Sequence, residues 1–427
     1  MAALLFGSFL GLMLLNIPIA VALGLGSMIA LFFGPMATPP LLVVQRMFTA
    51  VDSFPFMAIP FFMLAGGLME GGGISKRLVN FAKTLVGPVP GGLAIITIVS
   101  SAFFGAISGS NPATVASIGG IMIPAMIKAG YPKSYAAAVA AAAGTLGVII
   151  PPSIPMVTYG VVSGTSIGDL FIAGFIPGIA IALLLTFTVL FQAKRMGLKG
   201  DRKYTGKEIL LAAKDAIWAI FMPIIVLGGI YGGVFTPTEA AAVSVFYSLI
   251  VGLFVYKEFT IKDLPKTLIK AGISTSVVMF VIAASSSFSW LITSARIADS
   301  VTTAMMSISS NPLVIILLIN VLLLILGTFL ETQAIILLVA PLLIPLAAKV
   351  GLSPLALGII MVVNTSIGMI TPPMAVNLFV ACGIADLKIE QITKPILPLL
   401  AVESIFVLII SNFPQILEWL PRFIHGY

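Results

Sequence analysis

Apolar stretches separated by short polar segments run along the whole chain. Many have the length of a membrane-crossing helix, which needs roughly 20 apolar residues, and these lie near residues 2–15, 17–34, 53–70, 170–192, 216–236, 238–256, 271–293 and 396–412. Two others, 90–127 and 310–346, are too long for one simple crossing, and each holds a polar segment at its middle. Each of these either crosses twice, with its polar segment in water, or turns back inside the membrane. We expect two re-entrant helical hairpins.

The composition agrees with a protein that lies in a membrane. Of its 427 residues, 59% are hydrophobic and only 9% are charged, whereas a soluble domain carries about 25% charged residues. The single cysteine excludes a disulfide framework and a cysteine-based metal cluster. The first apolar stretch begins at Ala2 without a basic segment before it, which predicts a membrane span rather than a cleaved signal peptide.

The chain contains an internal repeat. When the sequence is shifted by 221 positions, IPAMIKAGYPKS, from Ile123, lies over IPLAAKVGLSPL, from Ile344. The same shift, continued without a gap, places Thr145, Gly147, Pro151 and Pro152 over Ser366, Gly368, Pro372 and Pro373. A nearly constant offset over such a length indicates two homologous halves, which we place at residues 1–205 and 206–427.

The positions of Lys and Arg predict how the halves are oriented. Residues 193–214 hold seven of these side chains, so we place this segment in the cytoplasm. The predicted spans then put 18 of the 22 Lys and Arg on the cytoplasmic side, with only Arg46, Arg296, Lys349 and Arg422 outside. Both termini lie outside, and the halves have opposite orientations, as in inverted-repeat secondary transporters. Residues 257–270 read as an amphipathic helix on the cytoplasmic surface.

Each half contains a pair of prolines in an apolar segment. Pro151 and Pro152 interrupt residues 134–163, and Pro372 and Pro373 interrupt residues 354–384. A proline has no N–H and frees carbonyl groups upstream, and irregular backbone at membrane depth is tolerated only when buried in protein or lining a cavity. Free carbonyl oxygens suit a hard cation such as Na⁺, and half-helix N-termini attract anions. The two broken helices, each facing a hairpin tip, therefore predict two related binding sites.

The candidate site residues are small or carry oxygen, and they lie at the hairpin tips and beside the breaks. The predicted sodium ligands are Ser108, Gly109, Asn111, Thr114, Thr145, Gly147, Gly327, Thr328, Glu331, Thr332, Asn364, Thr365, Gly368 and Thr371. The predicted substrate contacts are Ser110, Ser153, Thr158 and Asn377. Each group also has a structural interpretation: the tips as polar turns, Glu331 as the end of a helix, and the Gly, Ser and Thr positions as sites of close helix packing.

These residues carry a resemblance to a known family. AISGSNPATVASIGGIMIPAMIKAGYPKSYAAAVAAAAGTLGVIIPPSI, from Ala106, resembles the signature region of the large membrane subunit (DctM-like) of tripartite ATP-independent periplasmic (TRAP) transporters. QRMFTAVDSFPFMAIPFFMLAGGLM, from Gln45, and ETQAIILLVAPLLIPLAAKVGLSPLALGIIMVVNTSIGMITPP, from Glu331, fit the same family. The resemblance covers nearly the whole chain, and the general character of the sequence is similar to that of the sialic-acid members.

The resemblance implies a function and partners. It implies a sodium-driven importer of organic anions, such as C4-dicarboxylates or sialic acid, that lies in the bacterial inner membrane and uses an elevator mechanism. The implied partners are a small four-helix membrane subunit, a soluble periplasmic substrate-binding protein and membrane lipid. Na⁺ is the coupling ion, and no cofactor or nucleic acid is expected, because cytoplasmic Lys and Arg explain the net charge of +7.

Other functions are open or excluded. A self-sufficient sodium/dicarboxylate symporter or a cation antiporter shares the predicted architecture but works without a binding protein. An enzyme is not expected, because the sequence has no HExxH motif and its only histidine is at the tail, where no serine-hydrolase arrangement accompanies it. A GxxxxGK[ST] loop is also missing, so the sequence does not indicate ATP hydrolysis.

Overall fold

The computed structural model describes residues 1–36, 38–198, 200 and 202–425, and its regular structure over these ranges is helical. The first half of the chain gives α1 (Ala2–Leu14), α2 (Ile19–Phe33), α3 (Leu41–Val51), the 3-10 turn η1 (Phe54–Met57), α4 (Ala58–Gly71), α5 (Ile74–Val86), α6 (Gly92–Ser108), α7 (Asn111–Thr114), the π-helical turn η2 (Val115–Gly119), α8 (Gly120–Lys128), α9 (Lys133–Ala143), α10 (Leu146–Ile149), α11 (Ile154–Ser163) and α12 (Ile167–Arg195).

The second half passes through a similar series of elements. Its helices are α13 (Gly206–Tyr231), α14 (Pro237–Ile250), the π-helical turn η3 (Val251–Val255), α15 (Leu264–Ser294), α16 (Ile297–Ile308), α17 (Pro312–Phe329), α18 (Thr332–Lys349), α19 (Pro354–Gly368), α20 (Val376–Ala385), α21 (Ile389–Asn412) and α22 (Gln415–His425). In both halves, two apolar helices come first, and a short helix, a helical hairpin, a broken helix and a long helix come last. Between these two sets the second half has the single long helix α15, whereas the first half has α3, η1 and α4.

The helices confirm the predicted class of an all-helical, multi-span membrane protein. In the described part of the chain, eight helices are long and apolar enough to cross a membrane, or up to nine if one bent pair counts as a single span. That pair is Lys133–Ile149 with Ile154–Ser163, bent by 40° at the first double proline. Many Leu, Ile, Val and Phe side chains on these helices are exposed, as expected where lipid replaces water.

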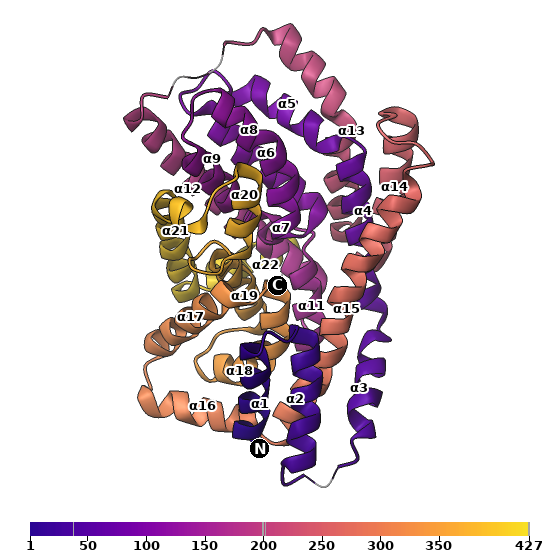
Figure 1. The fold of residues 1–427 in the computed structure, drawn as a ribbon, viewed down its shortest axis with the longest axis vertical. Helices are drawn as coiled ribbons and strands as arrows, with labels where there is room; N and C mark the ends of the chain where they lie inside the picture. The colour runs from indigo at the N-terminus through magenta and orange to yellow at the C-terminus, as the bar shows by residue number, and fades with distance from the viewer. Residues whose placement is uncertain (37, 199, 201, 426–427) are drawn as a thin grey trace.

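The helices form two groups. The flanking bundle consists of α1–α4 and α13–α15, in which α14 packs on α4 and α15 packs on α2, α3 and α4 (Figure 1). The hairpin bundle consists of α6–α12 and α17–α21, and it mixes the two halves of the chain: α11 packs on α18, and α21 packs on α9. The short helix α5 packs on both α13 and α6, so it connects the two bundles.

One local prediction was wrong. Residues 257–270 do not form a separate surface helix: a turn precedes Leu264, and the later residues belong to the first turns of α15. The Asp263 carboxylate accepts hydrogen bonds from the Thr260 N–H (2.9 Å) and the Thr260 hydroxyl (2.8 Å), and these bonds lower the pKa of Asp263 from its ordinary value. This turn and Pro265, in the first turn of the helix, set the start of α15.

Candidate functional site

The tip of the first hairpin is a tight polar turn between α6 and α7. Gly109 has φ 58°, a left-handed conformation in which glycine is favoured, and Ser110 is extended. The Thr114 hydroxyl donates to the Ser110 carbonyl (2.8 Å) and lies 3.0 Å from the Ser108 hydroxyl. Hydrogen bonds within the turn therefore hold the Ser108 and Thr114 hydroxyl groups.

The first broken helix lies directly against this tip. A Cβ atom added to Gly147 would lie 2.5 Å from the Ser110 carbonyl oxygen, so only glycine permits the observed approach. Pro151 and Pro152, joined by a cis peptide bond, have no N–H to offer to the carbonyl groups of Gly147 and Val148 four residues earlier. No described residue donates a hydrogen bond to either of these two carbonyl oxygens. They are thus available to a ligand.

Asn111 joins the tip to both broken helices. Its side-chain oxygen accepts a hydrogen bond from the Val148 N–H (3.0 Å), and its amide nitrogen donates to the Ser366 hydroxyl (2.6 Å). The Ser366 hydroxyl in turn donates to the Thr145 carbonyl (2.9 Å). Asparagine is suited to this position because its amide can donate and accept at once.

The second hairpin and the second break meet in a similar way. A Cβ atom added to Gly327 would lie 2.8 Å from the Gly368 Cα and 2.9 Å from the Thr365 carbonyl oxygen. Pro372 and Pro373 again follow in cis. Here, however, the carbonyl groups of Gly368 and Met369 accept from the N–H groups of Thr371 (2.9 Å) and Asn377 (3.1 Å). The carbonyl groups at the second break are therefore already used within the protein.

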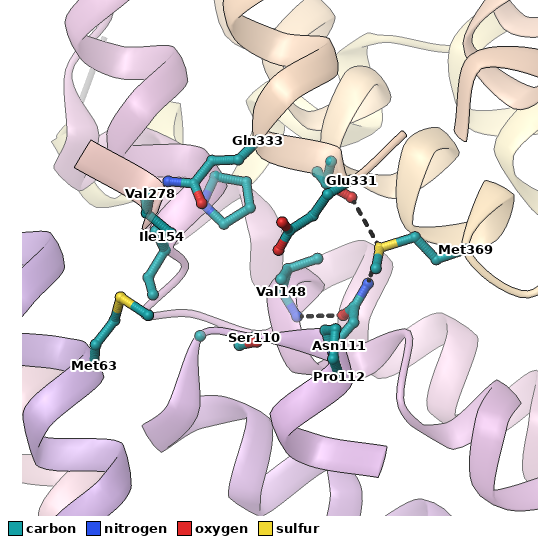
Figure 2. Close-up of a pocket in the computed structure, with 13 residues that line it drawn as sticks. Met63, Ser110, Asn111, Pro112, Val148, Ile154, Val278, Glu331, Gln333 and Met369 are labelled. Atoms are coloured by element: carbon teal, nitrogen blue, oxygen red, sulfur yellow. Dashed lines mark hydrogen bonds between the residues drawn. The ribbon is translucent and has the colours of Figure 1, made fainter. Parts of the chain in front are cut away.

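A cavity of about 40 Å³ lies between the two tips. Figure 2 shows Glu331 and Gln333 on one side of this space and Ser110, Asn111 and Pro112 on the other. The flanking bundle contributes Met63 from α4 and Val278 from α15. A space of this size holds a few water molecules or one acidic group, and it is too small for a whole metabolite.

A second cavity of about 870 Å³ adjoins the small one, since both are lined by Ser110, Glu331 and Met63. It follows the boundary between the flanking bundle and the first hairpin, with α4 and α15 on one side and α6 and α7 on the other. At its far end it is lined by Lys266 and Lys270, with Glu70 beside them. This cavity provides a path from the tips to one surface of the protein.

The structure brings most of the predicted residues into two groups, each containing one tip and one break. Glu331 and Thr332 line the small cavity together with Gly109 and Asn111, and Ser108 lines the large one. Of the other predicted ligands, Thr371 is partly exposed. The rest are buried between helices: Thr114, Thr145, Gly147, Gly327, Thr328, Asn364, Thr365 and Gly368.

Of the predicted substrate residues, Ser110 lines both cavities. The other three line neither cavity, and each has a bond within the protein. Ser153 caps the start of α11. The Thr158 hydroxyl accepts from the Gln333 amide (3.0 Å), and the Asn377 amide donates to the Ala141 carbonyl (3.3 Å).

Several buried polar residues of this region are not among those predicted from the sequence. Ser366 and Gln333 connect the two halves, as described above. Asn320 on α17 accepts a hydrogen bond from Asn364 (2.7 Å). Glu403 on α21 is fully buried and contacts Thr145. Glu403 carries a signal that was available: an acidic residue inside a span is costly and therefore indicates a role.

The described residues contain no group of three or more His, Cys, Asp or Glu that could hold a metal ion. The oxygens at the two tips are instead mainly hydroxyl, amide and backbone groups. These hard and mostly uncharged oxygen ligands suit an alkali-metal cation better than a transition metal.

The fold and the site together define a class. A multi-span helical protein whose helices break around a polar cavity, with a path from that cavity to one surface, is a membrane transport protein. Residues 6–416 match the family model "Tripartite ATP-independent periplasmic transporter, DctM component". The chain belongs to this TRAP transporter family of large permeases, and it is a transporter subunit rather than an enzyme.

Similar proteins have several substrates. The chain is 45% identical over 423 residues to an isethionate TRAP transporter permease protein, DctMQ, of Oleidesulfovibrio alaskensis; this covers 99% of the chain and 66% of that protein, just under two thirds of its length. It is 40% identical to a C4-dicarboxylate large permease of Vibrio cholerae (99% and 98% covered). It is 39% identical to a sialic acid large permease of the same species (90% and 90% covered).

A solved structure supports the fold alone. The Alcanivorax borkumensis YdaH transporter, described as having an unusual topology, superimposes with a TM-score of 0.63 at 14% sequence identity. The match covers 90% of this chain and 91% of that one. The helical fold of this chain is therefore found in an experimental structure with little sequence similarity.

Proposed function

We propose that this chain is the large membrane subunit of a sodium-coupled importer, and that a periplasmic binding protein delivers an organic anion to it. It works in the bacterial inner membrane with a small four-helix subunit, with both of its termini on the periplasmic side. Membership of the TRAP family supports the general function. The observation that carries the mechanism is the pair of unbonded carbonyl groups, Gly147 and Val148, beside a hairpin tip.

The two halves, residues 1–205 and 206–427, are inverted repeats with two re-entrant hairpins and two broken helices. The repeated order of elements supports this arrangement. The contacts at the tips also repeat: Gly105 approaches Gly147 as Gly327 approaches Gly368. Thr145 and Ser366, which the 221-residue shift aligns, are bonded to each other. Equivalent residues meet in this way only near a local two-fold axis.

Na⁺ binds first at the break in the first half. The free carbonyl oxygens of Gly147 and Val148 are suitable ligands, and the side-chain oxygen of Asn111 lies beside them because it accepts from the Val148 N–H. The hydroxyl groups of Ser108 and Thr114 belong to the same tip. At the second break the carbonyl groups are bonded internally, so a second ion there requires the second tip to shift.

The anion binds in the small cavity between the tips. Glu331, at the start of α18, makes no side-chain cap there, and Thr332 and Gln333 of the first turn of this 18-residue helix line the cavity. A helix N-terminus attracts an acidic group, whereas the Glu331 carboxylate repels it. Bound Na⁺ offsets this repulsion, which gives a physical reason for coupling cation binding to anion binding.

An elevator motion explains the two bundles. The hairpin bundle carries both tips, and the flanking bundle contributes α4 and α15, which line one side of the large cavity. The large cavity ends beside Lys266 and Lys270, at the surface where most Lys and Arg are expected by the positive-inside rule. We therefore interpret the structure as an inward-open state, from which the hairpin bundle moves across the membrane to reach the periplasmic partner.

The substrate is a small carboxylate or sulfonate. The relatives are named for isethionate, C4-dicarboxylates and sialic acid, and these compounds share an acidic group. The small cavity accommodates that group, and the remainder of the molecule extends into the large cavity. Sialic acid remains among the candidates, because the cavities impose no tighter limit on size.

The experiment that tests this function is uptake into proteoliposomes that hold this chain and its small subunit. Labelled isethionate, succinate and sialic acid are each supplied with or without the binding protein and an inward Na⁺ gradient. We expect one of the three to enter only when both are present. Sodium-driven uptake without the binding protein would establish a self-sufficient symporter instead. Uptake that does not depend on the Na⁺ gradient would contradict sodium coupling.

A further inference from the structure

The small and the large cavity join at a point that we call the neck. The residues that line both cavities define it: Met63, Ser110, Pro112, Val278 and Glu331. Met63 lies on α4 and Val278 on α15, both in the flanking bundle, whereas the other three belong to the hairpin tips. The proposed transport cycle gives no role to Met63 or Val278.

Met63 is the largest apolar side chain of the neck. Its Sδ atom accepts a weak hydrogen bond from the Thr275 hydroxyl (3.7 Å), so it is held against α15 one turn before Val278. Figure 2 shows the Met63 side chain on the side of the space opposite Glu331 and Asn111. Met63 and Val278 together therefore close one side of the neck.

Beyond Met63, α4 presents few side chains to the large cavity. The next residues of this helix that line the cavity are Gly66, Gly67, Glu70 and Gly71. An added Cβ atom would lie 3.5 Å from the nearest atom at Gly66 and 3.6 Å at Gly67, and it would meet nothing within 4 Å at Gly71. Close packing therefore does not require these glycines, although glycine destabilises a helix interior relative to alanine. They leave open space, so the passage is narrow at Met63 and widens beyond it.

The neck restricts the part of a ligand that lies next to its acidic group. The small cavity, of about 40 Å³, holds only that group, so the carbon atom that carries the group lies in the neck. In isethionate and succinate this carbon is an unbranched CH₂ group. In sialic acid it is a ring carbon without hydrogen, bonded to three other heavy atoms besides the carboxylate. A branched acidic end therefore needs a wider neck than a slender one.

We propose that Met63 and Val278 are specificity-determining residues, which restrict the site to organic anions whose acidic group is carried by an unbranched carbon. Such anions fit between the hairpin tips and the flanking bundle, whereas a branched acidic end meets the side chains of Met63 and Val278. The large cavity leaves the rest of the molecule free to vary. This inference rests on the anion site of the proposed function and on its inward-open state.

The two residues act on one side of the membrane only. They belong to the flanking bundle, whereas the tips belong to the hairpin bundle, so a movement of the tips across the membrane takes them away from Met63 and Val278. The neck therefore selects when the tips face the cytoplasm, at the step in which the anion leaves the site. This selection is independent of the periplasmic binding protein, so the membrane subunits alone suffice to measure it.

The test compares anion binding by the natural protein, Met63→Ala and Val278→Ala, each purified with the small subunit in detergent that contains Na⁺. The melting temperature is recorded against the concentration of two slender anions, isethionate and succinate, and of two branched ones, sialic acid and tetramethylsuccinate. A ligand that binds the folded state raises the melting temperature according to its affinity. We expect the natural protein to bind a slender anion at least about tenfold more tightly than either branched one, because a misfit of one methylene group already costs roughly that factor.

Both alanine variants widen the neck, so this preference should fall by about tenfold through tighter binding of the branched anions. Met63→Leu, which keeps the volume of the side chain, should retain the preference. The matched controls are Met279→Ala and Val277→Ala. Met279 lines neither cavity and Val277 lines only the large one, so both controls should keep the natural ratio of affinities.

The ratio of affinities distinguishes a failure of the neck from a failure of the proposed function. An unchanged ratio in Met63→Ala and Val278→Ala, with the slender anions still bound, would overturn the role of the neck alone. A branched anion that binds the natural protein as tightly as the slender ones would do the same. If none of the four anions stabilises the natural protein, the anion site itself is refuted. A variant that does not fold is recognised by its melting temperature without ligand, and the other alanine variant then decides.

Discussion

At the scale of single residues, Asn111 links the first hairpin tip to both broken helices by hydrogen bonds. It bonds the Val148 N–H in its own half and the Ser366 hydroxyl in the other, 255 positions away. Hydrogen bonds between membrane helices contribute only about 0.6 to 2 kcal/mol each, so Asn111 matters less for total stability than for the relative position of the tip and the two breaks. That position decides whether the Gly147 and Val148 carbonyl groups can share an ion.

We predict that Asn111→Leu abolishes Na⁺-dependent uptake in proteoliposomes. The change removes the acceptor of the buried Val148 N–H, which costs about 1–3 kcal/mol, and it also separates the tip from Ser366. The protein should still insert and purify, with a moderately lower melting temperature. The control is Asn412→Leu, because Asn412 is exposed and its side chain bonds only within α21. Normal sodium-driven uptake by Asn111→Leu, at equal protein level, would contradict the site.

At the scale of elements, each hairpin is fitted to its broken helix by glycine. The backbones of α17 and α19 come so close at Gly327 and Gly368 that a Cβ atom on either residue collides with the other. Other glycines of these helical segments, such as Gly383 on α20, have nothing within 4 Å of an added Cβ atom. Glycine is therefore required at the points of contact and replaceable elsewhere.

We expect Gly368→Ala to lower the stability of the protein by about 1–3 kcal/mol, the usual cost of overpacking, and to reduce uptake strongly, because the second tip must move aside. Gly383→Ala is the matched control. It should be neutral or stabilise α20 by up to about 1 kcal/mol. The comparison uses thermal unfolding in detergent together with uptake. Equal melting temperatures and equal uptake rates for the two variants would show that the close contact at Gly368 is not needed for stability or transport.

At the scale of the whole molecule, the large cavity determines from which side of the membrane the two tips are accessible. It extends from Ser110 to the surface that carries Lys266 and Lys270, and the positive-inside rule predicts that this surface lies in the cytoplasm. The connection between α16 and α17 lies at the opposite end of the molecule in Figure 1. A residue there should face the periplasm when the tip faces the cytoplasm.

Cysteine labelling tests this orientation. In a Cys382→Ser background, an impermeant thiol reagent should modify Ser110→Cys in inside-out vesicles and Ser310→Cys in right-side-out vesicles. Na⁺ should slow the first reaction, because ligands at the tip restrict access to it. Modification of both cysteines from the same side would refute the inward-open assignment.

Much of the fold could be predicted from the sequence because it depends on local patterns. Apolar length determines the spans, a double proline removes hydrogen-bond donors wherever it occurs, and a polar segment inside an apolar stretch must turn or find partners. Within the site, the Ser108–Thr114 turn is local for the same reason. The start of α15 was misjudged because the turn at Thr260 and Asp263 depends on a side-chain hydrogen bond, and the charge pattern does not reveal it.

The sequence by itself determined that this protein is a helical membrane transporter of the TRAP family, with two breaks in corresponding positions. The tertiary structure decided which residues meet. The bonds of Asn111 to Ser366, of Gln333 to Thr158 and of Thr145 to Glu403 all join residues 175 or more positions apart. Such pairs form only when the two halves dock, because the helix pattern fixes which face of each helix is buried but not which partner that face will meet.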